Sequence, residues 1–265
     1  MAEPTLPDGY IAHAPGFIAN EGPKLITGRF AHEDSFTLER FLATGGYQGL
    51  RTALGRAPAE VHAEVREATL LGRGGAGFPA GVKWGFCPEG VWPRYLVVNG
   101  DESEPGTYKD RLLMERDPHQ LIEGILIACY AVGLSQAFLY VRGEMALAQE
   151  RLATALDEAY AAGYVGAEIC GSNFSVDVVL HWGAGAYIVG EETALIESLE
   201  GNRGMPRLSR PTSRQPSAST ASRPSSTTSR HWPTSGGSWP TAPTPTRATG
   251  PKRHRAPDCS QCPAT

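Results

Sequence analysis

"DPHQLIEGILIACYAVGLSQAFLYVRG", residues 117–143, places a long apolar segment directly before a strand-like one. Asp117 suits a helix N-cap and Pro118 the first helical position, so the segment predicts a helix. Its apolar residues nearly surround the helix, which is typical of a buried one. The run AFLYVRG then predicts a strand, and YLVV at 95–98 predicts another strand before the helix. Together they form a strand, helix, strand unit.

The same alternation continues on both sides of this unit. Helices are expected at 35–46 with Ser35 as N-cap, at 58–70, briefly within 78–84, at 144–163 and at 190–201, and a half-buried strand at 174–183. Alternating strands and helices favour a three-layer α/β domain with a mostly parallel sheet.

Composition divides the chain into three parts. Residues 209–265 hold 31 Ser, Thr or Pro in 57 positions and no Val, Ile, Leu, Phe, Met or Tyr. Such a segment cannot bury enough apolar surface to offset its ordering entropy, so we expect a disordered tail there. Residues 1–30 are rich in Gly and Pro and predict an extended N-terminal segment. The α/β domain is expected at 31–208.

Charge and cysteine usage narrow the class of protein. Residues 1–208 hold 16 Lys plus Arg against 27 Asp plus Glu, which argues against nucleic-acid binding by the folded part. The sequence shows no secretory signal and no apolar run of membrane-spanning length, so we expect a cytoplasmic protein without direct membrane insertion. Cys87, Cys129 and Cys170 lack metal-ligand spacing and are interpreted as packing thiols.

"LGRGGAGF", residues 71–78, matches the dinucleotide fingerprint G-x-G-x-x-G. The fingerprint requires a preceding strand, whereas a helix is predicted here, so an ordinary dinucleotide-binding first turn is the minority interpretation. Backbone N–H groups of the loop, a helix start and Lys83 would suit a phosphate. A glycine turn without a ligand is the alternative.

"NGDESEPGTYKDR", residues 99–111, follows a predicted strand and puts Asp101, Glu102 and Glu104 at its carboxyl end, where open α/β sheets bind ligands. Clustered carboxylates repel phosphate but accept hydrogen bonds from ribityl or ribose hydroxyls and from ring N–H groups. The alternative is an acidic turn that caps the following helix.

"GAGAYIVGEETAL", residues 183–195, is a third glycine-rich approach to a helix. An aromatic face at Tyr187 beside backbone that only glycine leaves open suits a flat ring ligand. Glu191 and Glu192 in the first turn also have a structural explanation in the helix dipole. His119 and His181 lack a nearby nucleophile pattern and are interpreted as structural.

These three segments strongly resemble the FMN- and NADH-binding flavoproteins of bacterial NADH-quinone oxidoreductase, respiratory complex I, from about Gly28 to Leu208. The resemblance implies a Rossmann-like domain in which NADH passes a hydride to FMN and electrons continue through iron–sulfur clusters toward quinone. No side chain then needs to act as acid or base. The implied FMN-binding residues are Gly72, Arg73, Gly74, Gly75, Gly77, Lys83, Asn99, Asp101, Glu102, Ser103, Tyr187, Gly190, Glu191 and Glu192. The implied NADH-binding residues are Phe78, Phe86, Glu104 and Glu192.

The resemblance also implies partners: the other peripheral-arm subunits of complex I, especially the thioredoxin-like 2Fe-2S subunit, at the inner face of the cell membrane. The flavin subunits of NAD-linked hydrogenases and formate dehydrogenases are the alternative, although their acidic loop tends to read D-E-G-D-P-G. A non-catalytic FMN-binding fragment is a further alternative, and a polyanion-binding tail on an incidental α/β body is the last.

The resemblance stops after Leu208, where the family's later FMN loop and cluster domain do not follow. Cys259 and Cys262 form one C-x-x-C pair, which is too few ligands for the family's 4Fe-4S cluster. Allowed codons for residues 209–234 can be chosen so that the neighbouring frame spells a family-like continuation ending in Asn-Asn-Val-Glu-Thr. We therefore expect a truncated, impaired chain with an out-of-frame tail, which DNA sequencing would test.

Overall fold

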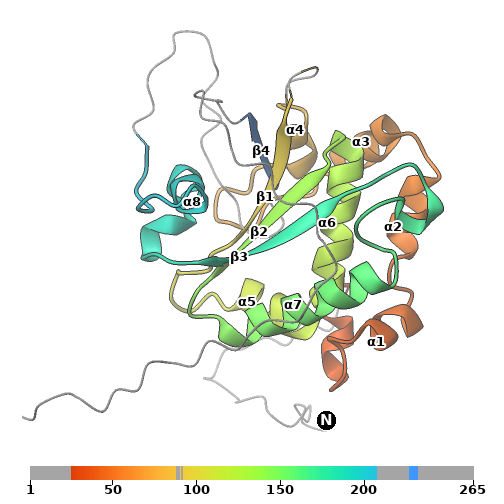
Figure 1. Cartoon of the computed structure of the whole chain (residues 1–265), viewed down its shortest axis with the longest axis horizontal. Coiled ribbons are helices and arrows are strands. Elements are labelled where there is room, and N and C mark those ends of the chain that lie inside the picture. The colour runs from red at the N-terminus through yellow and green to blue at the C-terminus, as the bar shows by residue number, and fades with distance from the viewer. Residues whose placement is uncertain (1–24, 88–89, 91, 208–226, 232–265) are drawn as a thin grey trace, which may run out of the picture. The chain divides into compact units, whose positions relative to one another are not determined.

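The computed structural model describes residues 25–87, 90, 92–207 and 227–231. Its sheet contains strands β1 (Arg94–Gly100), β2 (Gln136–Arg142), β3 (Asp177–Gly183) and β4 (Thr227–His231), in the order β3-β2-β1-β4. The first three strands are parallel (Figure 1). The predicted strand and helix alternation and the mostly parallel sheet are therefore confirmed.

The fourth strand departs from the expected tail. β4 pairs antiparallel with β1, with Val98 opposite Thr227, although it lies inside the segment expected to be disordered. Strand pairing uses backbone groups that every non-proline residue carries, so it does not need the apolar side chains that the tail lacks. The rest of the tail lies outside the described residues.

The helices follow the expected order with two additions. They are η1 (Gly28–Ala31), α1 (Leu38–Ala43), α2 (Gln48–Leu54), α3 (Pro58–Glu67), α4 (Ala80–Trp84), α5 (Lys109–Arg116), α6 (Pro118–Val132), α7 (Ala146–Ala161), η2 (Ile169–Gly171), η3 (Tyr187–Gly190) and α8 (Glu192–Leu199). The additions before the glycine loop are α2 and the short 3₁₀ helix η1, which stands within the segment expected to be extended.

The first predicted helix begins two residues later than expected. Ser35 is fully buried and is not the N-cap. Thr37 is the N-cap, because its backbone is extended there and its hydroxyl accepts from the Arg40 N–H at 3.3 Å. The Ser35 prediction was therefore wrong, since a serine caps only where the backbone leaves its hydroxyl facing the helix.

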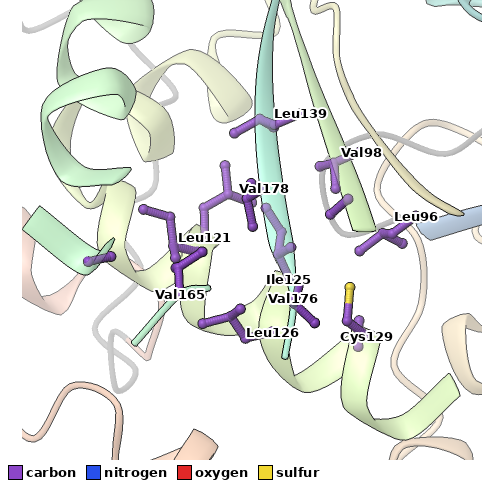
Figure 2. Packing of buried hydrophobic residues seen from close by; sticks show 14 of the residues in the cluster. Leu96, Val98, Leu121, Ile125, Leu126, Cys129, Leu139, Val165, Val176 and Val178 are labelled. Carbon is purple, nitrogen blue, oxygen red and sulfur yellow. The ribbon is translucent and has the colours of Figure 1, made fainter. Parts of the chain in front are cut away.

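The larger core lies on one face of the sheet, against α6. Figure 2 shows side chains of α6 and of the strands packed together, among them Leu121, Ile125, Leu126 and Cys129 from α6 and Leu96, Val98, Leu139, Val176 and Val178 from the strands. The Asp117 side chain caps α6 by accepting from the Gln120 N–H at 3.3 Å. The predicted buried helix and its cap are confirmed.

The opposite face carries a smaller cluster. Tyr140 of β2 is fully buried there and packs with Val189 and Leu195, which belong to η3 and α8. Successive strand residues point to opposite faces, so Tyr140 lies across the sheet from its neighbour Leu139. Helices on both faces make the predicted three layers. The carboxyl ends of β1, β2 and β3 meet at one edge, where the candidate site residues follow.

Candidate functional site

The end of β1 is tied to the segment that leads into α8. The Asn99 side-chain amide donates to the Gly190 carbonyl oxygen at 2.8 Å, and its side-chain oxygen accepts from the Asp101 N–H at 3.1 Å. Asn99 is only 4% exposed, so both bonds are protected from water. Two of the three predicted segments therefore meet at the same sheet edge.

Tyr187 supplies a second link between these two segments. Its hydroxyl donates to the Glu104 carboxylate, although both residues are exposed. The Tyr187 ring is 57% exposed, so a flat ligand could still reach it. The two residues join the acidic loop to η3 on the open side of the site.

Asp101, Ser103 and Glu192 are buried close to the same edge. Asp101 is 3% exposed, and it accepts a hydrogen bond from the Ser103 hydroxyl. Glu192, in the first turn of α8, is 8% exposed. Buried carboxylates cost free energy unless hydrogen-bond donors or cations surround them, so this edge is built for donors.

Two of the predicted ligand carboxylates bind helix N-termini of the chain itself. Glu102 accepts from the backbone N–H groups of Lys109, Asp110 and Arg111 at 3.0, 3.1 and 3.0 Å. Glu191 accepts from the backbone N–H of Thr193 and of Ala194, both at 3.0 Å. The helix-capping explanation therefore applies to Glu102 and Glu191, and their direct contact with a ligand stays a prediction.

The glycine loop closes on its own flanks. The Gly72 N–H donates to the Phe78 carbonyl at 2.9 Å, and the Ala80 N–H donates to the Leu70 carbonyl at 2.8 Å. Gly75 and Gly77 have φ values of +116° and +62°, and a Cβ on either would meet no atom within 4 Å. The loop therefore combines a left-handed backbone with open space beside it.

The remaining loop residues flank this space. Arg73 is exposed, Gly74 is half-buried, and Lys83 is half-buried in the last turn of α4. The rings of Phe78 and Phe86 lie 5.9 Å apart and are both exposed. How the loop faces the acidic loop stays a prediction.

Glycines 183 and 185 have a packing explanation that the sequence interpretation missed. A Cβ on Gly183 would lie 2.4 Å from the Tyr140 ring, and one on Gly185 would lie 2.2 Å from Val189. Side chains of the chain itself, and not a ligand, occupy the space beside these glycines.

Tyr140 is the functional-edge residue that sequence reasoning did not select. Its hydroxyl lies 2.9 Å from the Ser198 hydroxyl, and its ring stacks on His181 with centroids 5.2 Å apart. Burial raises the pKa of Tyr140 and lowers the pKa of His181. The period-two alternation of β2 was the available signal, because it sends Tyr140 to the face opposite Leu139.

His119 is placed away from any nucleophile, as expected for a structural histidine. It is fully buried, with Nδ1 3.1 Å from the Tyr47 hydroxyl and Nε2 2.9 Å from Glu158 Oε2. Burial lowers the pKa of His119, and the Glu158 carboxylate partly offsets this. The cluster joins α6 and α7 to the residue that precedes α2.

Metal ligands are not assembled in the described part of the chain, where no group of three or more His, Cys, Asp or Glu residues could hold an ion. Cys87, Cys129 and Cys170 are free thiols; Cys129 is buried as expected, whereas Cys170 is exposed. The Cys259 and Cys262 pair lies outside the described residues. Among the described helices, none has both the length and the apolar character needed to cross a membrane.

Parallel strands that end in buried polar side chains, beside exposed aromatic rings, define an α/β domain of the nucleotide-binding class. Residues 65–218 match the model of the Nuo51 FMN-binding domain, and the chain belongs to this family. The resemblance drawn from the three segments is thereby confirmed.

Curated relatives are named as the F subunit of NADH-quinone oxidoreductase. The Streptomyces coelicolor protein is 56% identical over 188 residues, which cover 71% of this chain and 42% of the relative. The Aquifex aeolicus protein is 53% identical over 175 residues, covering 66% of this chain and 41% of the relative. The chain therefore spans less than half the length of these relatives.

Among solved structures, a chain of an NAD⁺-reducing [NiFe]-hydrogenase in the H₂-reduced state is similar, with 40% identity and a TM-score of 0.54. The match covers 66% of this chain and 29% of that one. The similarity shows the shared fold, and it gives the hydrogenase alternative weaker support than the curated relatives give the first interpretation.

Proposed function

We propose that the chain carries the FMN- and NADH-binding part of an NADH dehydrogenase subunit. The observation that carries the proposal is the joining of β1 to η3 by the Asn99 to Gly190 hydrogen bond, with Tyr187 and Glu104 on its open side. Family membership supports FMN as the ligand.

The residues present fit such a ligand. Open space beside Gly75 and Gly77 leaves their backbone accessible, and Lys83 adds a cation for a phosphate. Buried Asp101 and Ser103 suit hydroxyl and ring N–H donors of a flavin chain. Contacts are proposed for Gly72, Arg73, Gly74, Gly75, Gly77, Lys83, Asn99, Asp101, Ser103, Tyr187, Gly190 and Glu192, while Glu102 and Glu191 shape the site through the helices that they cap.

When bound, FMN would accept a hydride from NADH and release electrons singly toward a cluster chain and quinone. The chain's own side chains would bind and orient. Exposed Phe78 and Phe86 would stack the nicotinamide ring, and Glu104 would accept from ribose hydroxyls, with Glu192 nearby. Positioning two rings in contact converts a bimolecular step into an effectively unimolecular one, so no acid or base is needed.

The whole enzyme's setting is also a proposal. The relatives' names support other complex I subunits as partners, including a thioredoxin-like 2Fe-2S subunit, in the cytoplasm at the inner face of the cell membrane. The family's 4Fe-4S ligands are not present in this sequence beyond Cys259 and Cys262. We therefore propose that this chain is truncated and impaired in passing electrons onward.

The test is an FMN titration of the full chain, followed by absorption and flavin fluorescence. Lys83→Ala should weaken FMN binding about tenfold through the loss of a charged phosphate contact. Arg56→Ala removes an exposed arginine paired with Glu60 and Glu64 and serves as the matched control with unchanged affinity. Absence of flavin binding by the unsubstituted chain at saturating FMN would contradict the proposal.

A second measurement separates an enzyme from a non-catalytic FMN-binding fragment. NADH should bleach the bound flavin, and added ferricyanide should restore its colour repeatedly. Bleaching without restoration would favour the fragment. The hydrogenase-type alternative predicts the same flavin result and rests on the solved hydrogenase chain.

A further inference from the structure

Glu102 is the most constrained carboxylate of the acidic loop. Its Oε1 accepts from the N–H groups of Lys109 and Asp110, and its Oε2 accepts from the N–H of Arg111. The Glu102 side chain is 3% exposed. Most of its acceptor capacity faces α5, so little remains for a ligand.

The first turn of α5 depends on this carboxylate. Tyr108 occupies the N-cap position with a left-handed φ of 51° and provides no side-chain cap bond. The first four N–H groups of a helix have no partner within the helix, and Glu102 satisfies three of them from six residues before Tyr108. The negative charge also complements the positive end of the helix dipole.

The same residue fixes the start of the loop to the sheet. The Glu102 carbonyl oxygen accepts from Arg142 Nη1, at the end of β2, at 3.3 Å. Both ends of the loop at 101–108 are therefore held through one residue. Between them, the Glu104 carbonyl accepts from the Thr107 N–H at 3.4 Å, and the Glu104 carboxylate accepts from Tyr187.

We infer that Glu102 is a positioning residue for the nucleotide site: by capping α5 it fixes the loop that presents Glu104 to Tyr187 and to the nucleotide ribose. This inference rests on the proposed function. It reassigns Glu102 from a direct ligand contact to a residue that acts through Glu104.

The test compares Glu102→Gln with the unsubstituted full chain. A glutamine keeps the shape, but its NH₂ group cannot accept from a backbone N–H, so the cap weakens. Hydrogen exchange of the amides at 109–111 in flavin-free protein should accelerate about tenfold. The KM for NADH, measured with ferricyanide, should rise several-fold while the bound-flavin spectrum stays unchanged.

Two further variants make the test decisive. Thr37→Ala removes the α1 cap and should leave NADH kinetics unchanged. In a Glu104→Gln background, Glu102→Gln should have little further effect on KM, because the residue through which it acts is already altered. Fully additive effects would instead indicate direct contact and overturn the inference.

Other outcomes are equally distinct. Unchanged exchange at 109–111 would show that Glu102 does not hold the helix, and faster exchange with unchanged KM would reduce it to a structural cap; either overturns the inference and leaves the proposed function standing. If the unsubstituted chain binds no FMN, the proposed function fails and the positioning role fails with it, whatever the exchange result.

Discussion

Asn99 donates to the Gly190 carbonyl oxygen at 2.8 Å, across 91 residues of sequence. This bond joins the carboxyl end of β1 to the turn before α8. A buried bond between segments so distant in the chain restricts how the two can move relative to each other, and both carry residues assigned to the same site.

Asn99→Asp should therefore destabilise the domain. The substitution places a carboxylate oxygen against the Gly190 carbonyl and removes the donor, at a cost of about 1–3 kcal/mol. Chemical denaturation measures the change in unfolding free energy. Asn202→Asp is the matched control, because Asn202 donates to Glu197 on the exposed surface, where the loss should be under about 1 kcal/mol. Equal losses in both variants would contradict the importance of the buried bond.

Gly183→Ala should displace Tyr140. The added Cβ would lie 2.4 Å from the Tyr140 ring, and relieving such a clash in a packed region costs about 1–3 kcal/mol. Gly124→Ala serves as control: it lies in α6 with no atom within 4 Å of the new Cβ and should stabilise by about 1 kcal/mol. Thermal unfolding of both variants checks the opposite signs, and stabilisation by Gly183→Ala would exclude this packing.

Tyr187→Phe should affect nucleotide binding more than stability. It removes the hydroxyl that holds Glu104 but keeps the ring. Because the bond is exposed, the unfolding free energy should change by less than about 1 kcal/mol, whereas the KM for NADH should rise roughly two- to tenfold. Tyr130→Phe removes another exposed hydroxyl, bonded to the Arg56 carbonyl, and should leave KM unchanged. A KM unaffected by Tyr187→Phe would argue against a role for this pair.

His119 predicts how stability depends on pH. Burial lowers the folded-state pKa of His119 below the ordinary value of 6.5, so the unfolded chain binds the proton more readily. The contribution is fully present above about pH 6.5 and is lost as pH falls toward the folded pKa, at up to about 1.4 kcal/mol per pH unit.

Denaturation at about pH 7.5 and about pH 5.5 measures this slope. His119→Gln should have a smaller slope than the unsubstituted chain, whereas His181, whose pKa is also lowered, contributes with the same sign to both proteins. An identical slope in the variant would show that His119 does not titrate in this range.

Much of the fold was predictable because it rests on local signals. The apolar pattern and Asp117 cap of α6, and the alternation in β3, depend on residues close in sequence. The cap of α1 was not predictable, because Ser35 and Thr37 have the same capping chemistry and only the backbone path selects Thr37. The strand β4 was also missed, since backbone pairing leaves little trace in side-chain composition.

By itself, the sequence determined the α/β class, the family and the three segments that carry the candidate site, because periodicity and glycine or carboxylate clusters are local properties. Only the tertiary structure decided how those residues are used. Glu102 and Glu191 cap helices, Gly183 makes room for Tyr140, and Asn99 binds Gly190. Each of these assignments depends on which donor or side chain lies across space from a residue, and that is set by the packing of segments far apart in the chain.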